Sequence, residues 1–243
     1  MRYWSAVDIL KQLSMELGLQ IQTTVVNVDN PQGSQLLAAL NSAGNELLLY
    51  YPWEQFAKQW EFPLVADQDE YPLPADWRYF RDQSQWDRTN HWPLLGPKSA
   101  AEWAFLKGGI VASFPRMRYR VKNDKLCFFP KPDSTSQYQM AMEYIASNWV
   151  FTSGDTPTTG PTKDMILQDG DIPWFDPWIL IKFTKLKFYQ LKGFDTAGVQ
   201  GDFMRVFEAL KGKDTGAPVL SLNQQKSPYF IGIQSIPDGS WSV

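Results

Sequence analysis

The spacing of apolar residues changes twice along this chain, and these changes constrain its fold more than any other feature. Near both ends, apolar residues recur every three or four positions, as they do on one face of a helix. In the middle they form short aromatic and β-branched runs separated by Pro, Gly and Asp, which is typical of strands. This order predicts an α+β fold with a β-rich insertion between helices.

The predicted organisation has a helical part, an insertion and a tail. A helical bundle built from N- and C-terminal helices comprises residues 1–53 and 156–217, because about four helices are the minimum for a bundle. The inserted β-rich domain covers residues 54–155, and an extended C-terminal tail covers residues 218–243. A chain of 243 residues is long enough for one large domain or two modest ones.

Local signals mark where the predicted helices begin and end. Serine, asparagine or proline stands at each start, where a first turn has N–H groups without helical partners. Glycine or proline stands at each end, because the one leaves the helical conformation easily and the other cannot continue it. The signals are Ser5 and Gly18, Asn30-Pro31 and Pro52, Ser99 and Gly108, and Pro177 and Gly193. A last helix follows, with an apolar stripe of Val199, Phe203, Val206, Phe207 and Leu210.

The clearest strand signal is a hairpin in residues 116–129, where Asn123-Asp124 has the residue types of a tight turn. Its first strand alternates apolar residues with Arg116, Arg118 and Arg120. Such a row could touch nucleic acid, but it is more typical of a solvated strand face. Two strands are also expected around the Asp-rich turn in residues 61–74, and an alternating strand in residues 137–150.

Composition argues against several classes of function. The net charge of −3 gives no basic footprint for a protein that binds nucleic acid by neutralising phosphates. The chain has one cysteine, Cys127, and one histidine, His91. These are too few for a zinc site or for an internal disulfide. Cys127 is expected to be a buried strand residue. We therefore expect no metal site and no cofactor.

Carboxylates are the remaining candidates for catalysis. They occur in small groups, and two carboxylates in a cleft can hydrolyse glycosides. However, Asp and Glu beside turns usually form those turns, and His91 would need a nucleophile beside it to act as a base. The groups are Asp67, Asp69 and Glu70; Asp82 and Asp87; and Asp169 and Asp171. The sequence predicts that the protein is not an enzyme.

The N-terminal stretch does not have the pattern of a targeting or membrane segment. Asp8, Lys11 and Glu16 interrupt its apolar residues, so it is expected to be neither a signal peptide nor a membrane span. We expect no membrane contact and a cytoplasm-like environment.

The last residues are apolar and carry little charge, although chain ends are normally polar. Pro218, Pro228 and Pro237 prevent a helix across this tail. An apolar segment that is not part of a core indicates a partner surface. The predicted partner-binding residues are Tyr229, Phe230, Ile231, Ile233, Ile236 and Trp241.

Several stretches, in order, resemble the head-to-tail adaptor proteins of short-tailed bacteriophages, also called tail tubular protein A or head completion adaptors. Residues 40–56, "LNSAGNELLLYYPWEQF", are similar to a small-residue helix of that family that ends in an aromatic step before an insertion. Residues 69–103 are similar to its Tyr-x-Leu-Pro-x-Asp step, Trp-Asp stretch, proline-glycine loop and short helix carrying Trp. The closing "IPDGSW" also resembles adaptor C-termini. The positions that carry the resemblance are Tyr71, Leu73, Pro74, Asp76, Asp82, Trp86, Asp87, Pro93, Gly96 and Trp103.

The resemblance implies a structural virion protein that is assembled in the host cytoplasm. It implies a ring of twelve copies below the portal protein, with helices toward the portal and the β insertion toward the tail nozzle, a tail tubular B-like protein. The tail would reach onto the portal, and dsDNA would pass through the lumen without sequence-specific binding. Two other classes stay open: a peptidoglycan-degrading tail enzyme, and a receptor- or glycan-binding tail module.

Overall fold

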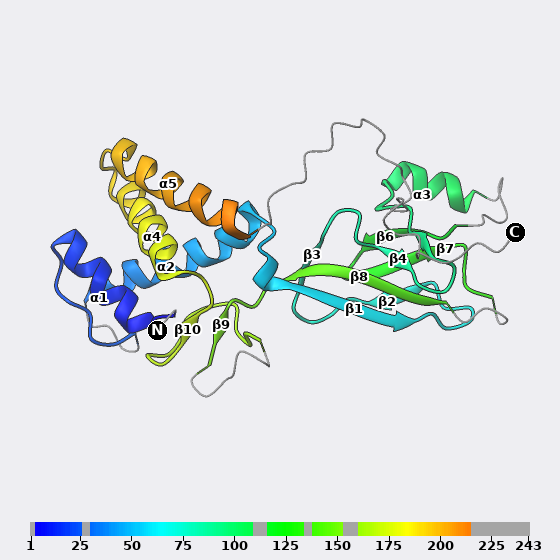
Figure 1. Cartoon of the computed structure of the whole chain (residues 1–243), viewed down its shortest axis with the longest axis horizontal. Coiled ribbons are helices and arrows are strands. Elements are labelled where there is room, and N and C mark those ends of the chain that lie inside the picture. The colour runs from blue at the N-terminus through cyan, green and yellow to red at the C-terminus, as the bar shows by residue number, and fades with distance from the viewer. Residues whose placement is uncertain (1–2, 26–29, 109–115, 134–137, 153–159, 215–243) are drawn as a thin grey trace, which may run out of the picture.

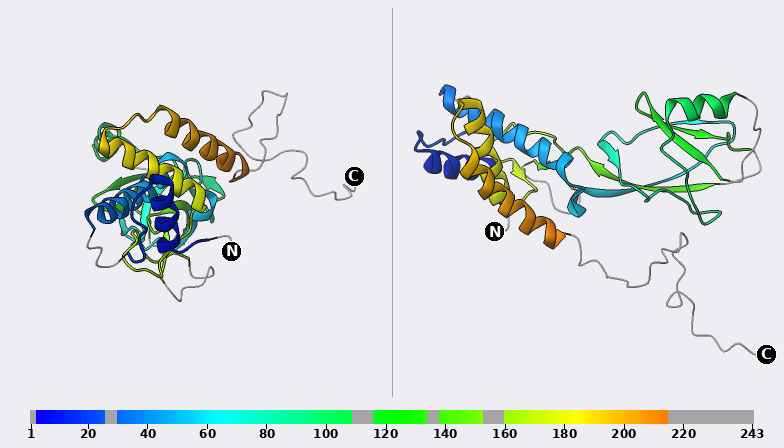
Figure 2. Two further views of the ribbon diagram at one scale, coloured as in Figure 1. Left: turned by 90° about the vertical axis from the view of Figure 1, so that its left-hand side faces the viewer. Right: turned by 90° about the horizontal axis from the view of Figure 1, so that it is seen from above.

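The computed structural model describes residues 3–25, 30–108, 116–133, 138–152 and 160–214. The described part is elongated, with most helices at one end and most strands at the other (Figure 1). The view from above shows the same separation (Figure 2). Helices together with antiparallel sheets confirm the predicted α+β class.

Helix α4 is central to the helical end, where it packs against α1, α2 and α5. The bounds are Ala6–Leu17 for α1, Pro31–Tyr50 for α2, Pro177–Lys192 for α4 and Ala197–Asp214 for α5. The predicted caps are confirmed. The Ser5 side chain accepts a hydrogen bond from the Asp8 backbone N–H, and Gly18 ends α1 at a φ of 64°. Asn30 caps α2 in the same way, with Pro31 as its first helical residue.

The core of the helical end includes a residue that comes from the strands. Trp149 follows the long strand β8 (Gln139–Ala146), is fully buried, and lies against Gly44 of α2. A Cβ built on Gly44 would lie 2.4 Å from the Trp149 ring, so this close packing requires glycine. The segment that leaves the sheet is therefore anchored among the helices.

Strand β8 is also the centre of the larger sheet. It pairs antiparallel with β1 (Ala57–Pro63), and on its other edge with β3 (Trp77–Phe80) and β4 (Trp86–Asp87). Strand β5 (Trp92–Pro93) pairs with β4. The alternation predicted for residues 137–150 is wrong, since every residue of β8 except Gln139 and Glu143 is buried. Packing on both faces, into the β-end core and the helical core, removes the polar face that alternation would need.

A second sheet has the order β2-β7-β6. Its strands are β2 (Glu70–Pro72), β6 (Arg118–Lys122) and β7 (Lys125–Phe129). The predicted hairpin is confirmed: Asn123 and Asp124 join β6 to β7 with φ of 51° and 53°. The expected strands around the Asp-rich turn are present as β1 and β2, but they belong to different sheets.

The remaining elements connect or cover these sheets. Helix α3 (Ala100–Lys107) packs Trp103 and Leu106 onto β7, where Cys127 is buried as predicted. The 3-10 turn η1 (Glu54–Phe56) leads from α2 into β1, and β9 (Val150–Phe151) pairs with β10 (Ile172–Pro173). The domain boundaries at residues 53/54 and 155/156 stay predictions.

Candidate functional site

Asp76 ends the Tyr-x-Leu-Pro-x-Asp step of the family resemblance, and it ties strands together. Its carboxylate accepts hydrogen bonds from Lys58 Nζ at 2.6 Å and from the Tyr144 hydroxyl at 2.8 Å. Burial, followed by the bond to Asp76, raises the pKa of Tyr144, so this hydroxyl stays a donor. Asp76 therefore joins β1 and β8 to the turn that precedes β3.

Other residues of the resemblance fix loops. The Tyr71 hydroxyl accepts the Val65 N–H at 2.7 Å and thereby closes the loop between β1 and β2. Gly96 lies so close to Tyr119 that a Cβ there would be 2.6 Å from the Tyr119 carbonyl oxygen. Tyr71 and Gly96 therefore have structural roles, because Tyr71 supports a loop and Gly96 allows a close backbone approach.

The paired carboxylates Asp169 and Asp171 hold the loop that precedes β10. Asp171 is fully buried, accepts the backbone N–H groups of Leu167 and Gln168, and pairs with Lys163 at 2.9 Å. Asp169 accepts the Thr24 hydroxyl at 2.9 Å. Both carboxylates therefore have structural partners.

The other candidate carboxylates are also placed in turns and ion pairs. Asp69 pairs with Lys107 at 3.3 Å, and Glu70 pairs with Lys125 at 2.7 Å. Asp87 is buried and accepts the backbone N–H groups of the turn that follows it, at Thr89 and Asn90. Asp67 adopts a φ of 61°, and Asp82 lies on the surface.

His91 is an exposed turn residue with a φ of 57°. Within the described residues, no group of three or more His, Cys, Asp or Glu could hold a metal ion.

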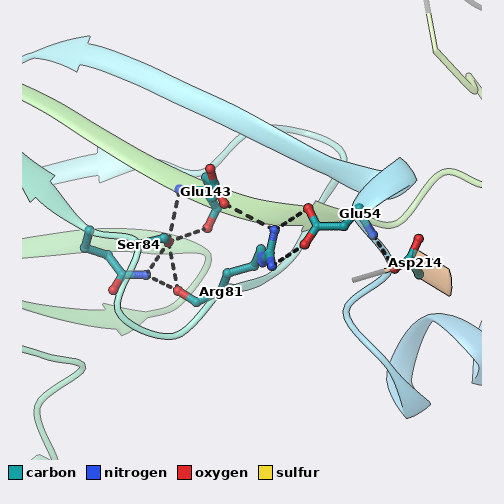
Figure 3. A network of polar contacts seen from close by, with 6 residues as sticks. Glu54, Arg81, Ser84, Glu143 and Asp214 are labelled. Carbon is teal, nitrogen blue, oxygen red and sulfur yellow. Dashed lines mark hydrogen bonds and ion pairs between the residues drawn. The ribbon is translucent and has the colours of Figure 1, made fainter. Parts of the chain in front are cut away.

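A polar network lies where the chain passes from the helices into the strands (Figure 3). Arg81, just after β3, contacts Glu54 of η1 and, at 3.4 Å, Glu143 of β8. The backbone N–H of Glu54 donates to the carboxylate of Asp214, the last residue of α5, at 3.0 Å. The Ser84 hydroxyl donates to the Arg81 carbonyl at 2.8 Å. Glu54 and Arg81 together thus link the end of α5 to strand β8.

A second ion cluster joins α1 to α4. Burial would raise the pKa of the Glu16 carboxyl, but hydrogen bonds from Lys182 and Lys185 outweigh it and lower that pKa. Both Nζ atoms lie 3.2 Å from Glu16 Oε2. The side chain of Trp178, one turn earlier on α4, is 45% exposed and has Lys182 Nζ 5.9 Å from its ring centroid.

An apolar groove lies between the end of α2, α4 and α5. Tyr50 forms one wall, is 57% exposed, and contacts the ring of Phe183. Met204 and Phe207 of α5 form the other wall, and Lys187 and Gln190 of α4 lie at the rim. The sequence carries no signal for this groove, because Tyr50 and Met204 fall within regular helical patterns.

The β end has an exposed apolar side chain of its own. Phe105 on α3 is 57% exposed and lines a surface groove with Leu95 and Arg118. The arginine row lies beside it, and the predicted alternation is present, with Met117 and Tyr119 buried between partly exposed arginines. Arg116 stacks over Trp92, with its guanidinium carbon 5.7 Å from the ring centroid. This end therefore combines an apolar groove with basic side chains.

The predicted partner-binding residues of the tail lie outside the described residues; they are Tyr229, Phe230, Ile231, Ile233, Ile236 and Trp241. In the described part, polar groups serve turns and ion pairs while large apolar side chains stand on the surface at both ends. These features are typical of a protein that works by contact with other proteins.

The family comparison agrees with this class. The model of the SU10 adaptor protein family matches residues 7–174, and the chain belongs to that family. It is thus a structural adaptor protein of bacteriophages, as the sequence resemblance indicates. No curated protein matches the chain.

No helix within the described residues combines the length and the apolar content that a membrane crossing needs.

Proposed function

We propose that this protein forms a head-to-tail adaptor ring that links the portal to the tail nozzle and lines part of the DNA channel. The family match over residues 7–174 carries this proposal. The elongated shape, with different surfaces at its two ends, supports it because a linker must bind a different partner at each end (Figure 1). The ring contains twelve copies, is assembled in the host cytoplasm and becomes part of the virion.

The helical end, residues 1–53 and 156–217, faces the portal, and the β end, residues 54–155, faces the nozzle. Exposed Phe105 and the groove beside it support a protein contact at the β end. The net charge of −3 supports a lumen in which dsDNA slides without sequence-specific binding, because few phosphates would be neutralised.

The tail, residues 218–243, attaches to the portal. Its proposed anchor is Trp241, since buried aromatic side chains dominate the energy of many interfaces. Truncation after Ser227 should weaken attachment to portal particles and leave the melting transition nearly unchanged. Trp241→Ala should reproduce at least part of that loss, about 2 kcal/mol. A much lower melting temperature of the truncated monomer would instead place the tail in the protein's own core.

The protein has no catalytic activity in this proposal. Alanine at Asp67, Glu70 and Glu102 should affect function only through folding. A zymogram on peptidoglycan tests the enzyme alternative: loss of a lytic band in a folded variant would contradict the proposal. Glycan binding by a monomer or trimer would favour the receptor-binding alternative.

The direct test mixes the protein with purified portal particles and images them by electron microscopy. The expected result is a ring of density below the portal, together with a change in the mass of the complex. Phe105→Glu should leave that ring in place and reduce recruitment of the nozzle protein. A portal that neither binds the protein nor changes its oligomeric state would contradict the adaptor function.

A further inference from the structure

We infer that neighbouring copies of this chain join through Trp178 of one copy and the groove between α2, α4 and α5 of the next. The inference rests on the proposed ring and assigns the surfaces that build it. A ring requires a head-to-tail contact, in which two different patches of the same chain meet. The helical end has such a pair, one projecting side chain and one concavity.

Trp178 is suited to be the projecting side. Its indole is 45% exposed and is braced by Trp4, whose ring centroid lies 5.8 Å away in an edge-to-face contact. The cluster of Glu16, Lys182 and Lys185 stands beside it. A large aromatic side chain held by neighbours loses little entropy on binding, so it is a favourable anchor.

The groove is suited to receive an aromatic side chain. Its volume is about 330 Å³, within the range of roughly 300–1,000 Å³ found for pockets that enclose small ligands. Tyr50, Phe183 and Phe207 give it an aromatic wall, and Met204 is a flexible side chain that adapts to what it contacts. The charged group at its rim, Lys187, is neutralised by Glu46 at 2.5 Å. The cluster beside Trp178 has two lysines and one glutamate and so carries a net positive charge. It would meet a rim whose lysine is already neutralised, so the two surfaces do not repel each other.

The two features lie on opposite sides of the same helix. At 3.6 residues per turn, Phe183 is about 140° and Lys187 about 180° around the axis of α4 from Trp178. The contacts agree, since Lys182 and Lys185 reach α1 while Phe183 stacks on Phe203 of α5 at 4.4 Å. Figure 1 and Figure 2 place α1 and α5 on different sides of α4. A copy can therefore use both features at once, which allows the assembly to continue from copy to copy.

Cysteine cross-linking tests the arrangement without removing the anchor. Gln12 on α1 precedes Glu16 by one turn, and Gln200 lines the groove. The chain carrying both Gln12→Cys and Gln200→Cys is bound to portal particles and treated with a short bismaleimide. The expected product on a denaturing gel is a ladder of multimers. Each single variant should stay monomeric, as should the natural chain, whose Cys127 is buried.

Substitutions test the energy of the contact. Trp178→Ala should weaken self-association by at least about 30-fold, the size of a hot-spot residue. The matched control is Trp92→Ala at the β end, where the indole is 37% exposed. Met204→Glu should reproduce the defect from the groove side, and melting curves show whether each variant is folded.

The outcomes separate this inference from the adaptor function. A dimer formed by either single-cysteine variant would overturn the inference, because it requires a symmetric contact. A ring on the portal without a ladder would also overturn the inference. It would mean that another partner occupies the groove. If the portal does not recruit the protein but the concentrated free protein gives the ladder, the proposed function fails and the contact stands.

Discussion

Arg81 holds Glu54 with both of its terminal nitrogens, Nη1 at 2.8 Å from Oε2 and Nη2 at 2.7 Å from Oε1. This parallel pair of bonds joins the strand side of the junction to the turn that leaves α2 (Figure 3). The hydrogen bond to Glu54 raises the pKa of Arg81 above its already high ordinary value. The charge is therefore permanent, and the planar geometry of the guanidinium sets the contact.

Arg81→Lys should weaken this junction although it keeps the charge. A lysine cannot match both carboxylate oxygens, so the variant should lose about 1 kcal/mol of unfolding free energy, the upper range for a partly exposed pair. Denaturant titration at low and at high salt measures the loss, which should shrink as salt screens the pair. A variant as stable as the natural protein at low salt would show that the two-point contact contributes nothing.

Gly44→Ala should destabilise the protein despite the better helix propensity of alanine. Propensity favours alanine by about 1 kcal/mol, but a Cβ 2.4 Å from the Trp149 ring forces repacking that typically costs about 1–3 kcal/mol. We expect a net loss of stability in thermal unfolding. The control is Gly201→Ala in α5, where nothing lies within 4 Å and alanine should stabilise the protein. Equal effects of both substitutions would contradict the close packing at Trp149.

Stability at acidic pH should depend on Glu16. A carboxyl whose pKa is lower in the folded state stabilises the fold above its unfolded pKa and loses this effect as the pH falls through the folded value. Glu16→Gln should therefore be less stable than the natural protein by about 1 kcal/mol at pH 7. The difference should disappear progressively below the ordinary value of 4.5. Urea titrations across pH 3–7 measure it, and a constant difference would exclude the lysine pairing as its cause.

Asp171→Ala should be among the most damaging single changes to a polar side chain in the helical end. It removes the acceptor of two backbone N–H groups and leaves Lys163 without its partner, which costs about 3 kcal/mol for a buried ion pair. The loss should be seen as a lower melting temperature. Asp8→Ala, at an exposed ion pair on α1, is the comparison and should cost no more than about 1 kcal/mol. Similar melting temperatures for the two variants would contradict the role of Asp171.

Helix ends were predictable from the sequence because their signals are local. The caps at Ser5, Asn30 and Ser99 and the stop at Gly193 require only residues within one turn, and the structure confirms them. Strand pairing was not predictable in the same way. Which strands flank β8 depends on residues up to about ninety positions apart in the chain, and such pairing leaves no local pattern.

The candidate surfaces were harder to predict than the fold. Trp178 belongs to an apolar pattern, yet it is 45% exposed, while Ile181 three residues later is fully buried. Periodicity identifies one apolar side of a helix, but it does not indicate where neighbouring helices stop covering that side. The tail residues around Trp241 stay a prediction.

The pairing of β1 with β8 has a mechanical consequence for an elongated adaptor protein. The strands run antiparallel, in register from Ala57 opposite Ile145 to Pro63 opposite Gln139, along the route that leads from the helical end into the β end. Ladder hydrogen bonds in such a pair are perpendicular to the strands. Because Ala57 and Ile145 both lie at the helical end, traction along the length pulls on both strands side by side and does not slide one along the other. An adaptor loaded along its length is thus held by two covalent strands in parallel, and the ladder keeps them together.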